Sequence, residues 1–276
     1  MSTDGEGEPS GASLSYENVL DREMENALKE LSRPSEGLFL SGLAAGLNVS
    51  FGALFMGMVL TFSPSFPSPL VKHLLLAGAS AVGFLFVILG QTELFTAHTT
   101  LAVLPVLDGR SSLADLGHLW GVVYVANLVG CGLFAALIAV LGPSLGIVTP
   151  AAFASIADSL LGLPWWTVLL SGVVAGWLMG LVTWLVAASR DTISRIVIVL
   201  VVTTTIGFGP FHHALLGTTE LLSAMFLGTG VTAVQYGTVL FWTTLGNVLG
   251  GSVFVAGLNY GHAARAGKDV SVTTDA

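Results

Sequence analysis

Charged residues are scarce in this sequence. Of its 276 residues only 9% are Asp, Glu, Lys or Arg, whereas 53% are hydrophobic. Soluble domains carry about 25% charged residues. So few charges cannot cover a surface that faces water, and we therefore expect most of the outside to face lipid. The length suits one compact domain of six spans of about 20 residues each, joined by short loops.

Cysteine is scarce, and the sequence shows neither the pattern expected of a signal peptide nor an ATP-binding motif. The single cysteine, Cys131, lies in an apolar segment, which excludes a disulfide or a cysteine-based metal site within one chain. The acidic start holds no basic stretch followed by an apolar run, so we expect no cleavable signal peptide. Without an ATP-binding motif, any transport is expected to be passive or ion-coupled. We expect no cofactor and no bound metal.

The negative charge is concentrated at the start of the chain. Nine of the seventeen acidic residues precede Gly37, although the whole chain has a formal charge of −8. An acidic tail argues against nucleic acid as a partner and against anchoring on anionic lipid. Residues 15–33 place apolar residues at helical spacing among charged ones, which predicts an amphipathic helix that lies on the membrane surface or against the body. Pro34 ends it.

Long apolar blocks fill the rest of the chain, and we place them at 38–62, 71–107, 117–141, 166–188, 194–228 and 236–260. With six spans, eight of the nine Lys and Arg residues fall on one side, and only Lys72 falls on the other. The positive-inside rule then puts both termini in the cytoplasm. The predicted parts are an acidic tail with its helix (1–36), a six-helix transmembrane domain (37–262) and a cytoplasmic C-terminal tail (263–276), in the cell membrane of a prokaryote.

Two related motifs indicate an internal repeat. Residues 127–134 read Asn, two aliphatic residues, Gly, two small residues, an aliphatic residue and Phe, with Asn127 and Gly130 as the first Asn and Gly. Residues 247–254 repeat this pattern 120 residues later, with Asn247 and Gly250 in the same places. Two halves of three spans each must be inverted relative to one another, a plan that puts a transport site at the bilayer midplane. We interpret these four residues as packing positions. The alternative is a chance likeness between glycine-rich helices.

Polar residues interrupt the second and fifth blocks. The second holds Glu93, Thr96 and His98, and the fifth holds Gly207-Phe208-Gly209-Pro210-Phe211-His212-His213. Broken backbone at membrane depth is tolerated where protein buries it or where it lines a polar cavity. His213, Gly217 and Glu220 share one face of a helix that begins near the second break. The positive end of that helix favours an anion at the break.

Several segments together resemble the formate/nitrite transporter family. They are Leu94-Phe95-Thr96, Asn127-Leu128-Val129-Gly130, Ser189-Arg190-Asp191, Gly207-Phe208 followed by His213, and Gly246-Asn247-Val248-Leu249-Gly250-Gly251. The resemblance implies an all-α membrane protein with an aquaporin-like protomer, spans two and five broken, and a homopentamer with one pore in each protomer. It also implies that His213 is the central histidine of the pore.

The resemblance assigns further residues to the pore. Thr96 matches the loop threonine that faces the histidine, Phe95 the constriction beside it, and Phe208 a constriction of the second loop. The chain departs from the family at Gly217, where asparagine is usual, and at His212, where an acid is common. It therefore resembles a divergent branch.

The predicted function is transport of small monovalent anions such as formate or nitrite, linked to protons through His213, which titrates near physiological pH. For His213, His212, His98, Glu93 and Glu220 the alternative is a structural role with a buried partner. A neutral-solute channel for water, ammonia or hydrogen sulfide would show flux without current. A closed-pore sensor would show no flux, and a membrane metalloenzyme would hold metal after purification.

Overall fold

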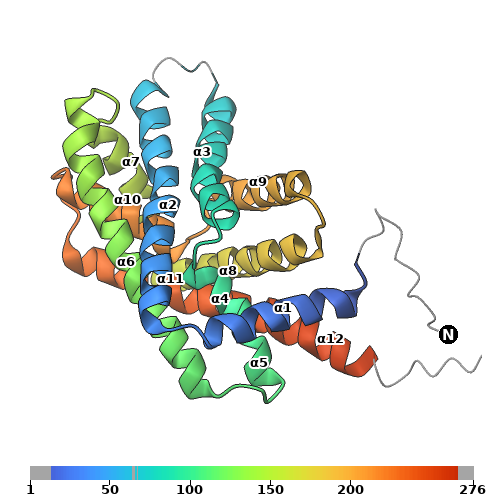
Figure 1. Ribbon diagram of the computed structural model, residues 1–276. Coiled ribbons are helices and arrows are strands. Elements are labelled where there is room, and N and C mark those ends of the chain that lie inside the picture. Colours follow the sequence, from blue (N-terminus) through green and yellow to red (C-terminus); the bar gives the residue numbers. More distant parts are fainter. Residues whose placement is uncertain (1–13, 64–65, 67, 267–276) are drawn as a thin grey trace, which may run out of the picture.

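The computed structural model describes residues 14–63, 66 and 68–266; in these ranges helices are joined by short connecting segments, and there is no strand. Figure 1 shows the helices in order of sequence colour. Their bounds are α1 Tyr16–Leu31, α2 Ser35–Phe62, α3 Pro69–Leu89, α4 Phe95–Leu101, α5 Leu104–Leu107, α6 Leu113–Ser144, α7 Pro150–Leu161, α8 Trp165–Ala188, α9 Thr192–Phe208, α10 Ala214–Phe226, α11 Ala233–Leu249, η2 Gly250–Gly257 and α12 Leu258–Ala266.

Five helices are long and apolar enough to cross a membrane. They are α2, α3, α6, α8 and the continuous helix of α11, η2 and α12 from Ala233 to His262. Large apolar side chains project outward from them, including Leu133, Leu170 and Phe241, each more than half exposed. Such surfaces suit lipid rather than water. The chain is an all-helical membrane protein, as composition predicts. The remaining block, 194–228, contains two shorter helices, α9 and α10.

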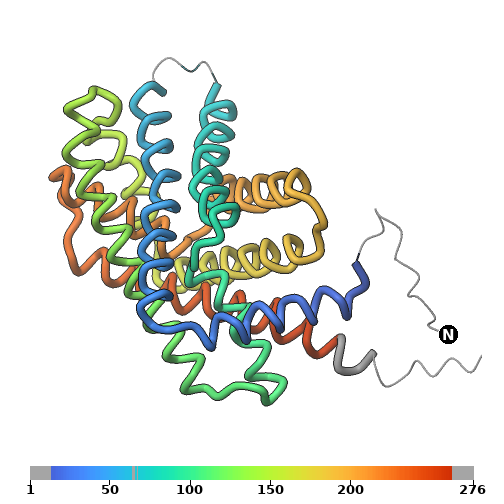
Figure 2. The backbone as a smooth tube through the Cα atoms, viewed as in Figure 1, coloured from blue at the N-terminus to red at the C-terminus, as the bar shows by residue number. Residues whose placement is uncertain are grey.

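The helices form two groups that meet at the centre. In the first group α2 packs against α3 and α6; in the second, α8 packs against α9, α11 and η2, and α3 contacts α9 across the groups. The tube in Figure 2 shows α2, α3 and α6 running steeply, while α8 and α9 run across them. The short helices α4 and α10 fill the middle, since α4 contacts α8 and η2 and α10 contacts α6 and α7.

Glycines let the helices within each group approach closely. A methyl group on Gly46 would lie 2.3 Å from the carbonyl oxygen of Asn127, and one on Gly176 would lie 2.2 Å from that of Asn247. Gly130 and Gly250 face carbonyl oxygens of the opposite helix at 2.4 and 2.1 Å by the same measure. The backbones of α2 and α6, and of α8 and α11–η2, therefore touch where both motif glycines lie.

The segment between predicted blocks three and four, 142–165, contains a helix. Thr149 caps α7 by accepting a hydrogen bond from the backbone N–H of Ala152, and Phe153 and Ile156 are buried against α10 and α2. Twelve residues are too few to cross a bilayer, so hydropathy gave no sign of it. α6 is also longer than block three, because Ser112 and Asp115 form a capping box at its start.

Helix α1 lies against the body of the protein. It packs on α4, α5, α8 and α12 with Val19, Met24 and Ala27 buried, and Ser15 caps its start. Of the predicted tails, residues 1–13 and 267–276 lie outside the described residues. α12 continues as helix to Ala266, past the predicted start of the C-terminal tail.

One acidic residue of α1 is buried in this contact. Glu23 is 3% exposed, its Oε2 has no hydrogen-bond partner among the described residues, and burial raises the pKa of its carboxyl from 4.5 to about 8. Below pH 4.5 the group is protonated whether α1 is docked or not. Between pH 4.5 and 8 only the undocked state loses the proton, so docking weakens as pH rises, by up to about 5 kcal/mol above pH 8.

We therefore expect Glu23→Gln to stabilise the protein at pH 8 and to leave stability almost unchanged at pH 4. Thermal unfolding of detergent-purified protein at the two pH values, with Glu25→Gln on the exposed side of α1 as the control, measures this difference. An equal effect of Glu23→Gln at both pH values would mean that its charge does not oppose docking.

Candidate functional site

Asn127 holds the first break in place. The break runs from Gly90 to Leu94, between α3 and α4. Oδ1 of Asn127 accepts a hydrogen bond from the backbone N–H of Phe95 at 2.8 Å, and Nδ2 donates to the carbonyl oxygens of Gly42 at 2.7 Å and Glu93 at 2.9 Å. One buried amide thus ties α6, α2 and the start of α4 together, and it satisfies the N–H of Phe95 and the carbonyl of Glu93, which have no helical partner.

Asn247 does the same at the second break. Its Oδ1 accepts from the backbone N–H of Ala214 at 2.9 Å, and its Nδ2 donates to the carbonyl oxygens of Gly172 at 2.8 Å and His212 at 3.0 Å. The two asparagines therefore make corresponding contacts in the two helix groups. The motif predicts a packing role for both asparagines, and their hydrogen bonds show that they also support the backbone of the breaks.

His213 and Thr96 meet between the two breaks. Nε2 of His213 lies 2.8 Å from Oγ1 of Thr96, and both residues are buried. The ring also contacts the edge of Phe84, with centroids 4.8 Å apart. Nδ1 of His213 accepts a hydrogen bond from the backbone N–H of Leu216 at 3.3 Å and so caps α10. Because Nδ1 is an acceptor, the neutral ring carries its proton on Nε2 and donates it to Thr96.

A cavity of about 270 Å³ reaches His213 from one side. We call it the vestibule. Its apolar lining near the histidine includes Ile206, Phe211 and Leu216, and its polar lining is formed by Lys72, His73, Ser80, Ser155, Ser159 and Glu220. Gly217 also lines it, so the shared helical face of His213, Gly217 and Glu220 is present in the structure.

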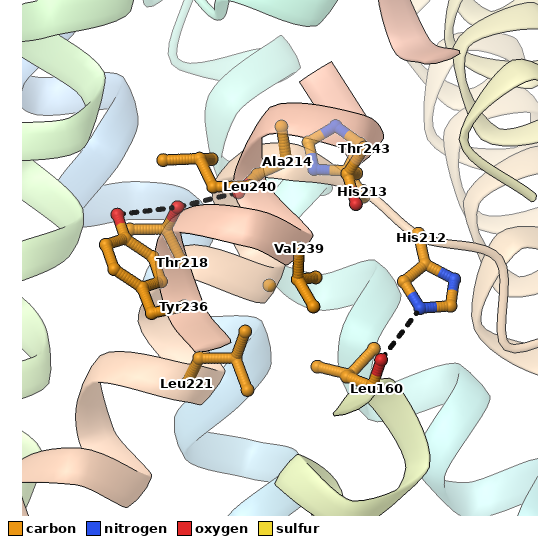
Figure 3. A pocket seen from close by; sticks show the side chains of 11 residues that line it. Leu160, His212, His213, Ala214, Thr218, Leu221, Tyr236, Val239, Leu240 and Thr243 are labelled. Carbon is orange, nitrogen blue, oxygen red and sulfur yellow. Dashed lines mark hydrogen bonds between the residues drawn. The ribbon is translucent and has the colours of Figure 1, made fainter. Parts of the chain in front are cut away.

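A second cavity, of about 10 Å³, lies between α10 and α11 and is just large enough for one water molecule. Figure 3 shows it lined mainly by the apolar side chains of Leu160, Leu221, Val239 and Leu240. Tyr236 closes one end, where its hydroxyl donates to Oγ1 of Thr218 at 3.4 Å.

His212 is held by the protein rather than turned toward Thr96. Its Nδ1 lies 2.9 Å from Oγ of Ser171, and its Nε2 lies 3.4 Å from the carbonyl oxygen of Leu160. Figure 3 shows its ring turned toward Leu160 and away from the ring of His213. Its partners thus lie on α8 and α7.

His98 and Glu93 are joined to Arg33, in the segment between α1 and α2. Oε2 of Glu93 lies 2.5 Å from Nε2 of His98, while Oε1 of Glu93 accepts from Arg33 at 3.0 Å. Arg33 also pairs with Glu30 at 2.6 Å, and the hydrogen bond with Glu30 raises the pKa of the Arg33 guanidinium. The first break is thereby linked to the segment between α1 and α2. Neither His98 nor Glu93 lines the vestibule.

The two predicted constriction phenylalanines have different surroundings. Phe95 is 4% exposed and packs against the rings of Trp120 and Tyr124, beside Thr96. Phe208 is 43% exposed, contacts His73 and does not line the vestibule. From the same loop it is Phe211 that lines the vestibule. Phe211 carries no signal in the sequence that marks it over Phe208, because the two differ only in the direction that the chain takes around Pro210.

Most of the chain matches known proteins. Residues 17–261 match the family model of formate/nitrite transporters. The chain is 31% identical over 251 residues to a probable formate transporter of Methanothermobacter thermautotrophicus, covering 83% of this chain and 89% of the relative. It is 29% identical over 233 residues to the nitrite transporter NirC of Salmonella typhimurium (82% and 83%) and 28% identical over 251 residues to the inner membrane protein YfdC of Escherichia coli (90% and 77%).

Two solved structures share the fold. One is described as an FNT family ion channel, with a TM-score of 0.80 and 24% identity over 90% of this chain and 99% of that one. The other is a pentameric formate channel with formate bound, with a TM-score of 0.70 and 22% identity over 84% and 98% of the two chains. At these identities they support the fold alone.

Proposed function

Because the chain belongs to the formate/nitrite transporter family, we propose that it carries small monovalent weak-acid anions, of the formate or nitrite kind, across a cell membrane. The family consists of channels and transporters, not enzymes, which answers the metalloenzyme alternative. The observation that carries the proposal is the buried pair of His213 and Thr96, which joins the two breaks at the inner end of the vestibule.

The proposed architecture has six spans in two inverted halves, with α9 and α10 together as the broken fifth span. The corresponding contacts of Asn127 and Asn247, 120 residues apart, support it. The distribution of Lys and Arg supports cytoplasmic termini. A homopentamer is supported by the pentameric formate channel of the same fold.

In the proposed mechanism an anion enters the vestibule and reaches Thr96. Crossing the apolar stretch lined by Phe211 and Phe95 as a bare ion is costly, whereas a neutral acid crosses more cheaply. When His213 takes up a second proton from water in the vestibule, it can pass the Nε2 proton through the Thr96 hydroxyl to the anion. The ring is then neutral with its proton on Nδ1, the acid crosses, and exchange of ring protons with water restores the form that carries its proton on Nε2.

The test is the anion-evoked current and flux in proteoliposomes, with formate, nitrite, acetate, lactate and chloride at pH 5 and 7. A hydrogen bond to a charged group contributes about 1.5–3 kcal/mol, and about 1.4 kcal/mol is tenfold. We therefore expect His213→Ala to lower weak-acid flux by about 10-fold to 100-fold and to remove most of its pH dependence.

The matched control is His212→Ala, which removes the neighbouring ring without touching Thr96. We expect it to keep the pH dependence of the wild type. Silence for every anion from folded wild-type protein would refute anion transport, and flux of ammonia or hydrogen sulfide without current would then favour the neutral-solute channel. Equal effects of the two histidine variants would refute a special role for His213.

A further inference from the structure

Glu220 is an acidic side chain without a partner in the vestibule. It lies on α10 seven residues after His213, and the residue is 5% exposed. Among the residues that the structure describes, none forms a hydrogen bond or an ion pair with its carboxyl group. Buried carboxylates are nearly always paired, so this one calls for a ligand or a proton.

Gly217 leaves the carboxyl group open to the cavity. A methyl group built on Gly217 would have one atom within 4 Å, Oε2 of Glu220 at 3.9 Å. A larger residue at position 217 would stand between the carboxyl group and the space beside His213. The glycine therefore opens the path between the two titratable groups.

Few other ionisable groups face Glu220. From α3, Lys72 and His73 line the vestibule, and the ring of His73 is bound to the carbonyl oxygen of Phe208 at 2.7 Å. The vestibule-lining residues of α2 and α7 are apolar or serine. α6 brings the buried thiol of Cys131 near α10, and α11 brings Tyr236, whose hydroxyl bonds to Thr218. Lys72 lies beyond ion-pair distance of Glu220, so the two side chains do not neutralise each other in a direct ion pair.

An anion and an ionised Glu220 in one cavity repel each other. Each charge disfavours the ionised form of the other, so binding of the anion favours binding of a proton to Glu220, and by linkage the proton favours the anion equally. A protonated carboxyl also has an O–H that can donate to an oxygen of the anion. The same group thus repels an anion when ionised and binds it when neutral.

We propose that Glu220 is a proton-linked selectivity site, which admits a weak-acid oxyanion to the vestibule together with one proton held on its carboxyl group. This inference rests on the proposed transport of anions and adds a second titratable residue to it. The proton comes from water on the vestibule side. A carboxylate or nitrite oxygen accepts the O–H hydrogen bond more strongly than chloride does, so such oxyanions are favoured over chloride.

The experiment compares flux of formate and chloride through wild type, Glu220→Gln and Glu220→Asp in proteoliposomes between pH 5 and 8. Gln keeps a hydrogen-bond donor but cannot ionise, so we expect formate flux at pH 8 to rise about 3-fold to 10-fold and the pH profile to flatten. Asp restores an ionisable group, so its profile should again fall toward pH 8. Glu36→Gln, on the exposed first turn of α2, is the matched control and should leave the profile unchanged.

The outcomes separate the two proposals. A wild type that carries formate with a pH profile identical to that of Glu220→Gln overturns the role of Glu220 and leaves anion transport standing. A folded wild type without any anion flux overturns anion transport itself.

If Glu220→Gln does not fold, a second measurement tests the proposal. It is proton uptake on addition of formate to His213→Ala protein in weakly buffered detergent solution, where the ring of His213 cannot contribute. We expect about one proton for each bound anion near pH 8, and no uptake on saturating formate overturns the proposal.

Discussion

Replacing Asn127 or Asn247 by leucine is expected to abolish the folded protein. Each asparagine makes three hydrogen bonds to the backbone, two of them to groups at a break, and each is fully buried. Leucine has a similar volume but leaves the two groups at the break without partners, at about 1–3 kcal/mol for each group. Two such losses are a large share of the whole stability of a typical protein, about 5–15 kcal/mol.

The measurement is the yield of monodisperse protein after detergent extraction, followed by thermal unfolding. Asn48→Leu is the matched control, since Asn48 lies in α2 and forms no hydrogen bond through its side chain with any residue in the described ranges. We expect near wild-type yield for the control. Normal yield and melting temperature of Asn127→Leu or Asn247→Leu would mean that the breaks do not depend on these amides.

The second large effect is expected at the glycines between the paired helices. In Gly250→Ala the new methyl group would lie 2.1 Å from the carbonyl oxygen of Val173 and 2.6 Å from the backbone nitrogen of Trp177. Both atoms belong to the backbone of α8, so the helices must separate. Overpacking of this kind costs about 1–3 kcal/mol or more, and we expect a fall in melting temperature of about 5–10 °C or loss of expression.

Gly117→Ala is the control for this series. A methyl group there meets nothing within 4 Å, and alanine favours a helix over glycine by about 1 kcal/mol. Its melting temperature should therefore stay level or rise. If Gly250→Ala and Gly117→Ala behave alike, close approach of α8 and η2 is not what the glycine provides.

Much of the fold could be predicted because the lipid-facing helices require apolar sequence over their whole length. The same constraint exposes Glu93, Thr96 and His98 as an interruption, and α3 does end at Leu89 before them. The likeness to formate/nitrite transporters, carried by short motifs at Phe95, Asn127 and Asn247, is confirmed by the family match over residues 17–261. Helix α7 could not be found this way, because it is half-buried and too short to span.

The site was predicted less completely, because partners that are distant in sequence leave no periodic signal. The motif gave His213 and Thr96, 117 residues apart, and the structure brings them together. No pattern links Arg33 to Glu93, or Ser171 to His212, since these pairs depend on how α1 and α8 pack. The choice between Phe208 and Phe211 depends on the path of four residues around Pro210, which sequence spacing does not determine.

The capping of α10 by His213 restricts what can replace this residue. Position 213 must offer an acceptor to the N–H of Leu216, and in the proposed mechanism it must also exchange a proton with Thr96. Asn and Ser can cap a helix but do not exchange a proton near neutral pH, and Lys exchanges a proton but offers no acceptor. Imidazole meets both requirements through its two nitrogens. A proton on Nδ1 removes the acceptor of the hydrogen bond from the Leu216 N–H. Each proton bound there therefore loosens the first turn of α10 until it leaves Nδ1.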